Sequence, residues 1–248
     1  MLGFRGTAQV AHMTGDPSTD RAADARFDRR LFGATAALAL LIVLVGFAQS
    51  LYLRAWFDTP PISPLRYLHG AAMTLWYVLF LAQVTLVARK RTDLHRRLGV
   101  LTAVTGAVLI PLGIATAAAY IARVHGDPDE GPVSAVIFAF DAVALLVFAV
   151  LVGTALVKRA RSDVHKRLMT IASLSLLGPP LARLMSDEHA LWCTWACMLV
   201  PVVVDTVYHR RLHPAFGWSA ALVLVANHLA LHFGTQPRWV GFALRTFG

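Results

Sequence analysis

The chain has 248 residues, of which 57% are hydrophobic and 15% are charged, and its formal net charge is +9. This composition is atypical of a soluble domain of such length and typical of a membrane protein. The positive charge does not indicate nucleic-acid binding, because the basic residues gather in short loops between apolar segments. Those loops are also too short to contain a separate soluble catalytic domain.

Seven apolar segments approach or exceed the length that crosses a bilayer core, which takes about 20 helical residues. We therefore predict an all-α, polytopic bundle of seven transmembrane helices. The fifth and sixth segments are short and contain Pro179, Pro180 and Pro201, so kinks are expected there. The predicted spans are residues 31–53, 67–88, 98–122, 133–157, 168–185, 190–208 and 215–234.

The ends of the chain are more polar than this domain. Residues 1–29 lack apolar periodicity and are predicted to be a disordered cytoplasmic tail. Residues 30–237 form the predicted seven-helix domain, and residues 238–248 a tail on the external side.

The basic residues predict the orientation of the bundle. Of 23 lysines and arginines, 17 fall in the N-terminal tail and in the loops at 89–97, 158–167 and 209–214. Cytoplasmic loops carry such an excess, so the N-terminus is expected inside. We expect a multi-pass protein of the bacterial inner membrane, in contact with the lipid bilayer and not with nucleic acid.

A short motif occurs twice, seventy residues apart. Residues 91–98 read Arg-Thr-Asp-Leu-His-Arg-Arg-Leu, and residues 161–168 read Arg-Ser-Asp-Val-His-Lys-Arg-Leu. Each copy follows one apolar segment and opens the next. This pattern predicts a tandem repeat of two parallel helical hairpins, related by an axis along the membrane normal.

His95 and His165 occupy the same position in the two copies, which leaves two interpretations open. In the first, Thr92 and Ser162 cap the helices, each histidine reaches back to the cap, and the two histidines stay apart. In the second, the histidines face a metal, a quinone headgroup or a proton path together with nearby groups. Asp205, His209 and His213 are those groups, because their spacing of four places them on one helical stripe.

A second group of polar residues falls in the external half of the predicted bundle. An ionised carboxylate in lipid is costly, so Asp141 is expected to face the interior and to need a partner, for which Arg183 is the candidate. The pair either joins two helices structurally or lines a cofactor pocket. His69, His228 and His232 lie at a similar depth, and haem b needs two such histidines on different helices. The candidate cofactor-binding residues are His69, Asp141, Arg183, His228 and His232.

No recognised catalytic motif occurs in the chain, so the sequence leaves open whether the protein is an enzyme. It lacks a phosphate-binding glycine loop, a zinc-protease helix motif and a nucleophile elbow. All three lysines are in predicted cytoplasmic loops, which excludes a retinal Schiff base within a helix.

Several short stretches resemble a family of bacterial seven-helix membrane proteins that has no assigned activity. They are residues 52–57, Leu68-His69-Gly70, residues 93–99 and 165–169, Pro179-Pro180-Leu181-Ala182-Arg183, and Asp205 followed by His213-Pro214. The resemblance covers about residues 28–245 and implies the same seven-helix fold. More distantly, the transmembrane histidines and His-Arg loops resemble b-type cytochromes and oxidase-assembly membrane proteins.

Three functional hypotheses follow. The first is a redox-linked membrane protein that binds haem b or a quinone within the bundle. The second is a non-catalytic accessory or assembly subunit of a larger membrane complex. The third is a small-solute transporter, which the repeat and Asp141 suggest and which the lack of a clear pair of broken helices disfavours.

Overall fold

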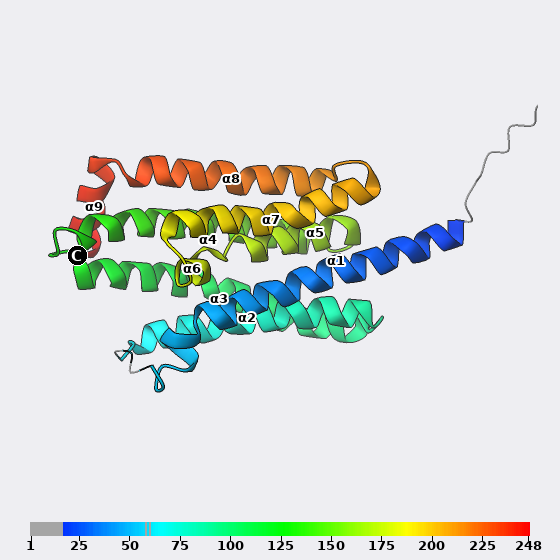
Figure 1. Cartoon of the computed structure of the whole chain (residues 1–248), viewed down its shortest axis with the longest axis horizontal. Coiled ribbons are helices and arrows are strands. Elements are labelled where there is room, and N and C mark those ends of the chain that lie inside the picture. The colour runs from blue at the N-terminus through cyan, green and yellow to red at the C-terminus, as the bar shows by residue number, and fades with distance from the viewer. Residues whose placement is uncertain (1–16, 58, 60) are drawn as a thin grey trace, which may run out of the picture.

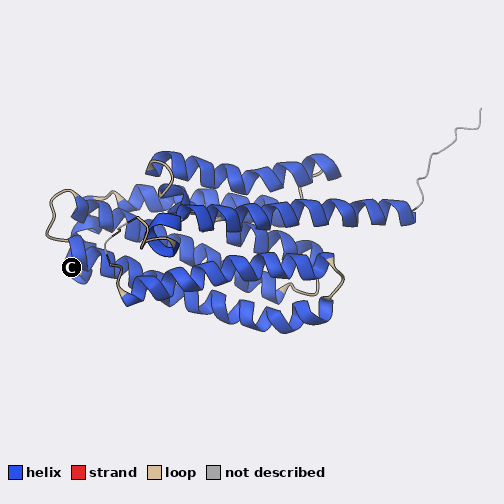
Figure 2. Ribbon diagram, turned by 60° about the horizontal axis from the view of Figure 1, so that its bottom comes forward, coloured by secondary structure: helices blue, strands red, loops and turns tan. Residues whose placement is uncertain are grey.

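The computed structural model describes residues 17–248 apart from residues 58 and 60. Within these residues every regular element is a helix (Figure 2). Most of the helices lie roughly side by side along one axis, and α1 crosses the bundle at an angle (Figure 1). Residues 1–16 of the predicted tail lie outside the described residues.

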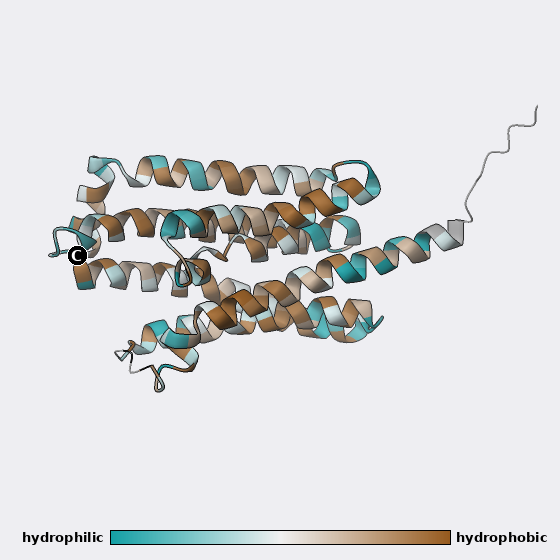
Figure 3. Ribbon diagram, viewed as in Figure 1, coloured by the Kyte–Doolittle hydropathy of each residue, from teal (hydrophilic) through white to brown (hydrophobic). Residues whose placement is uncertain are grey.

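Six helices are long and apolar enough to cross a bilayer, so the chain is a multi-pass integral membrane protein. Apolar residues fill their middle sections, and polar residues gather toward the two ends of the bundle (Figure 3). These helices are α1 (Pro17–Gly46), α2 (Pro64–Ala88), α3 (Thr92–Val124), α4 (Glu130–Val157), α7 (Asp187–His209) and α8 (Pro214–Gly234).

The predicted span 168–185 is not a continuous helix. It is divided into α5 (Ser162–Leu174) and α6 (Gly178–Ala182). Pro179 and Pro180 explain the break, because each lacks an N–H group and its ring clashes with the preceding helical turn. The carbonyl of Ser173, freed by the break, accepts a hydrogen bond from the buried Tyr77 hydroxyl at 2.8 Å.

Both predicted tails contain helical structure. Helix α1 begins at Pro17, so residues 17–29 extend the first span instead of forming a loose tail. They are held by contacts with the bundle, since the Phe27 ring stacks on Tyr208 at a centroid distance of 3.7 Å. At the other terminus the residues after 236 form α9 (Pro237–Phe247), whose Trp239 indole donates to the Ala135 carbonyl at 2.9 Å.

The corner after α1 is a short π-helical turn, η1 (Ala48–Tyr52), which brings the chain back toward α2. Helix α4 then occupies the centre of the bundle, packed against α3, α5, α8 and α9. Helix α5 lies between α4, α8, α1 and α7. The polar first turns of α5 therefore contact several helices at once.

Candidate functional site

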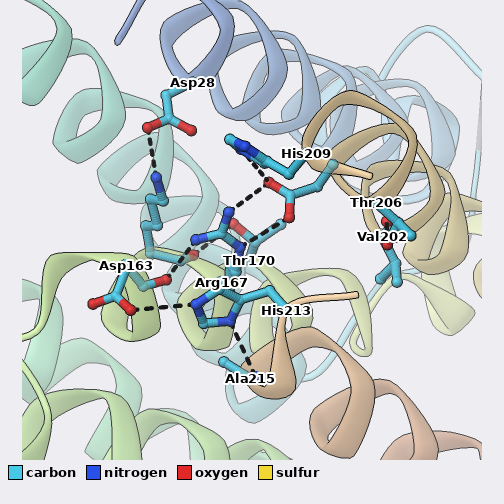
Figure 4. Close-up of polar contacts among 11 residues, drawn as sticks. Asp28, Asp163, Arg167, Thr170, Val202, Thr206, His209, His213 and Ala215 are labelled. Carbon is cyan, nitrogen blue, oxygen red and sulfur yellow. Dashed lines mark hydrogen bonds and ion pairs between the residues drawn. The ribbon is translucent and has the colours of Figure 1, made fainter. Parts of the chain in front are cut away.

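Polar side chains from four helices converge at one end of the bundle. This end, called here the basic end, holds the loops 89–91, 158–161 and 210–213 and the first half of α1. Figure 4 shows a polar cluster there, built on Arg167 of α5 and approached by side chains of α1, α7 and α8. Three predicted residues, Asp205, His209 and His213, belong to it.

The centre of the cluster is a buried ion pair between Arg167 and Asp205. The Arg167 guanidinium donates from Nε to Asp205 Oδ2 at 3.1 Å and from Nη2 to Oδ1 at 2.6 Å. The two side chains are 4% and 0% exposed. This bidentate geometry satisfies both carboxylate oxygens, which a buried charge requires. The pair fixes α5 to α7.

His213 connects this pair to the start of α8. The Arg167 Nη1 donates to the Asp163 carbonyl at 2.9 Å, and the Asp163 carboxylate lies 3.2 Å from His213 Nε2. His213 Nδ1 accepts from the Ala215 backbone N–H at 3.2 Å, which makes the imidazole the N-cap of α8. An N–H group can only donate, so Nδ1 carries no proton and Nε2–H donates to Asp163.

The electrostatic surroundings favour the neutral form of this imidazole. Burial and the neighbouring Arg167 charge lower the pKa of His213, and together they outweigh the opposing effect of Asp163. Partial burial tends to raise the pKa of Asp163, but the contacts with His213, the Val164 N–H and Arg161 outweigh it and lower that pKa.

On the other side of Arg167, α1 contributes Asp28. Its Oδ2 pairs with Lys166 Nζ at 2.5 Å, while its Oδ1 is buried and has no hydrogen-bond partner. His209 Nε2 lies 3.7 Å from Asp205 Oδ1. Ligand atoms of Asp28, Asp205 and His209 fall within 4.8 Å of one another, a spacing that suits a metal ion. However, Lys166 and Arg167 already neutralise both carboxylates.

An apolar groove lies deeper in the membrane between the same helices. It has a volume of about 180 Å³. Its lining residues are Thr35, Leu38, Ala39, Ile42, Leu174, Leu177, Ala196, Cys197, Val200 and Pro201. Along α1 it begins seven residues from Asp28, and along α7 it begins four residues from Asp205. At 1.5 Å per residue it therefore starts about 6–10 Å from the polar cluster.

The repeated histidines form a separate pair. Their rings meet edge to face with centroids 6.4 Å apart, and the expectation that they do not share a metal ion stays a prediction. The predicted caps were wrong, because Arg91 and Arg161 are the N-cap residues and no side chain caps either helix. Asp93 and Asp163 in the first turns supply the negative charge that favours a helix N-terminus.

Hydrogen bonds fix the orientation of both imidazoles. His165 Nδ1 lies 2.8 Å from the Ala155 carbonyl and must donate to it, which leaves Nε2 without a proton on the neutral ring. The Gln83 amide fits its surroundings with its nitrogen on His95 Nδ1 at 2.5 Å and its oxygen accepting from the Gly99 N–H at 3.0 Å. His165 thus faces α4, while Arg167, two residues on, faces α7. The five predicted ligands are therefore divided between two faces of α5. One face holds His95 and His165, and the other holds Asp205, His209 and His213.

The predicted ion pair between Asp141 and Arg183 is not formed. Arg183 is exposed, and its guanidinium lies over the Phe47 ring at 5.4 Å. The break after Leu174 is the cause, because α6 packs mainly on α7 and α1 and takes Arg183 away from α4.

The residues predicted for haem do not converge either. Helix α2, with His69, packs against α1 and α3, whereas α8 packs against α4, α5, α7 and α9. His228 and His232 are both exposed on the outward face of α8. The arrangement therefore does not fit a haem held between His69 and either of them.

Arg167, Lys166 and Asp28 are members of the cluster that the sequence did not reveal. Arg167 belongs to the repeated motif, but its counterpart Arg97 is exposed. No sequence feature distinguishes the two arginines, because burial depends on the helices packed against each copy.

Comparison of the chain with protein-family models, with curated proteins and with solved structures finds no match. Membership of the bacterial seven-helix family stays a prediction.

Replacing Asp205 by Asn tests the buried ion pair. The change leaves the Arg167 charge buried without its partner, which should lower the free energy of unfolding by roughly 3–5 kcal/mol. Thermal unfolding in detergent measures the loss. Asp93→Asn is the control, since the Asp93–Arg91 pair is exposed and should contribute little. Equal stability of wild type and Asp205→Asn would show that the pair does not hold α5 to α7.

The His213 cap predicts a dependence of stability on pH. The folded protein holds the pKa of His213 below its ordinary value of about 6.5. The associated stability is therefore complete above that value and is lost as the pH falls and Nδ1 gains a proton. His213→Asn can still cap α8 and should flatten the decline in melting temperature on acidification. An unchanged acid profile in this variant would contradict the assignment.

Proposed function

We propose that this chain is an inner-membrane protein that binds an isoprenoid quinone at the basic end of the bundle, between α1, α5 and α7. In this proposal the basic end faces the cytoplasm, as the distribution of lysine and arginine favours. The broken segment, α5 with α6, is counted as one span, which together with the six continuous helices gives seven. The α2–α3 and α4–α5 hairpins are the two repeats.

The main support for the proposal is the position of the polar cluster, which lies next to the apolar groove on the side of the basic end. The same helices line the groove and supply the cluster, so a ligand with a polar head and an apolar chain could contact the cluster and the groove together. At the head position, Asp28 Oδ1 is a buried acceptor without a partner, and the His209 imidazole lies nearby. A quinol hydroxyl can donate to such a carboxylate, and a quinone carbonyl can accept from a protonated imidazole.

The charges favour a quinone over a phospholipid. Lys166 and Arg167 are each paired with a carboxylate, so neither is available to a phosphate group. A neutral head with two oxygens needs no unpaired cation. The groove is smaller than the roughly 300–1,000 Å³ of pockets that enclose drug-sized ligands, which suits part of an isoprenoid chain and not a haem.

Titration of the purified full-length protein with a short-chain ubiquinone in detergent tests the proposal. Ala196→Trp should fill the mouth of the groove, and His209→Ala should remove a headgroup contact. We expect each change to weaken binding at least about tenfold, which corresponds to about 1.4 kcal/mol. Isothermal titration calorimetry gives the affinities directly.

Ala221→Trp is the matched control, because Ala221 is exposed on α8, away from the groove. It should bind the quinone as wild type does. Equal affinity in wild type and Ala196→Trp would contradict the proposed site. Binding of phosphatidylglycerol in place of the quinone would identify the groove as a lipid site.

A second candidate function, a subunit of a larger membrane complex, is favoured by the outward face of α8. His228 is exposed there, although it lies six residues, or about 9 Å, inside the end of the helix at Gly234. Gly234 itself packs against Ala139, well inside α4. A polar side chain facing lipid at this depth is costly and commonly marks a contact with another helix. Trp218 and Phe233 are exposed on the same face.

If the chain is a subunit of a larger complex, the particle extracted in a mild detergent should contain more protein than the 27.0 kDa of one chain. His228→Leu should release the partner, whereas Val225→Leu on the same face should not. Light scattering during size-exclusion chromatography measures the protein mass. A wild-type protein that is monomeric after gentle extraction would contradict this function.

A further inference from the structure

The two copies of the repeated motif touch through their histidines. His95 lies in the first turn of α3 and His165 in the first turn of α5, and their rings meet edge to face with centroids 6.4 Å apart. Helices α3 and α5 both pack against α4, and they are not among the helix pairs that pack closely on each other. The histidine contact therefore joins the first turns of two helices that are otherwise held together through α4.

Each ring is fixed by a hydrogen bond at its Nδ1 atom. His165 Nδ1 donates to the Ala155 carbonyl, so the ring can take a proton at Nε2 and keep this bond. His95 Nδ1 accepts from the Gln83 amide nitrogen, so His95 is neutral in this arrangement. A proton at His95 Nδ1 requires the amide to turn over, and the amide oxygen then gives up its bond from the Gly99 N–H.

The acidic residues of the two motifs are engaged elsewhere and do not neutralise the histidines. Asp93 contacts Arg91, and Asp163 contacts His213 and Arg161. Among the residues that the structure describes, no carboxylate forms an ion pair with either imidazole of the pair. Two imidazolium ions in contact would therefore repel each other with no counterion between them.

The other groups around the pair are neutral or positive. Helix α2 contributes the amide of Gln83 and α4 a backbone carbonyl, so neither adds a charge. On α3 the positive charge of Arg96 acts on His95, as does a charge on His165. On α5 the two basic residues that follow His165 are paired with carboxylates of α1 and α7. Acidification therefore adds repulsion at this contact.

We propose that His95 and His165 form a pH-sensitive contact between the α2–α3 and α4–α5 hairpins, closed when His95 is neutral and open when both rings carry a proton. In acid, His165 takes a proton at Nε2 and His95 takes one at Nδ1. The Gln83 amide then turns over, and the first turns of α3 and α5 move apart. The contact uses the face of α5 toward α4 and not the polar cluster, so it does not depend on quinone binding.

The distance between two nitroxide labels in the full-length protein tests the contact. Thr92 and Ser162 are exposed and begin α3 and α5, so both can carry a label on cysteine once Cys193 and Cys197 are replaced by alanine. Pulsed electron paramagnetic resonance measures the distance at about pH 8 and about pH 5, either side of the ordinary histidine pKa of about 6.5. At the lower pH we expect it to lengthen by roughly 3 Å, the width of a water layer between the charged rings.

Variants of the pair separate its titration from a general effect of acid. His165→Gln retains a donor for the Ala155 carbonyl but cannot take up a proton, so its label distance should be the same at both pH values. His95→Gln should behave in the same way. A wild-type distance that does not change with pH would overturn the proposal, as would a lengthening that persists in both variants.

Two other histidines provide controls. His213→Asn removes the titrating cap of α8, and His189→Gln removes an exposed histidine that contacts Ser186 at the opposite end of the bundle. Both should lengthen in acid as wild type does, and loss of the response in His213→Asn would assign it to the cap and overturn the proposal. Quinone binding should be the same in His165→Gln and wild type at about pH 8, so the two proposals fail independently.

Discussion

The bidentate ion pair between Arg167 and Asp205 is the interaction on which the arrangement of the basic end depends. Both charges are buried and each neutralises the other, so α5 and α7 must keep one register. That register sets the position of Asp163, which Arg167 holds through its carbonyl and which in turn contacts the His213 cap of α8. It also places Lys166 where Asp28 of α1 can reach it. One buried pair thus organises four helices, and the candidate ligand groups Asp28 and His209 lie at its edge.

The break after Leu174 is the second constraint. A continuous fifth helix would carry Arg183 toward α4 and fill the space between α1 and α7. The prolines of α6 stop the helix early, and the groove remains beside the shortened end of α5. The same break leaves Asp141 without the arginine expected as its partner. It therefore accounts both for the apolar groove beside the cluster and for the unpaired carboxylate on the opposite side of the bundle.

The sequence was a good guide wherever one local property decides the structure. Long apolar runs predicted seven spans, and six of them are helices long and apolar enough to cross a membrane. Prolines at 179 and 180 indicated a kink but not a complete break, because the consequence depends on whether Tyr77 can satisfy the freed carbonyl. The difference in burial between Arg167 and Arg97 could not be predicted, since the two similar motifs pack against different neighbours. The exposure of His228 could not be predicted either. Its position along α8 suited an interior ligand, but the packing of α8 leaves this side chain on the outward face.

We propose that the groove and the polar cluster form one binding site for a quinone. Photolabelling of membranes containing the full-length protein with an azido-quinone, followed by mass spectrometry of the peptides, tests this site. We expect labels on residues 35–42 of α1 and 196–201 of α7, which excess unlabelled quinone should suppress. Labels confined to α2 and α3, or labels that unlabelled quinone does not suppress, would contradict it.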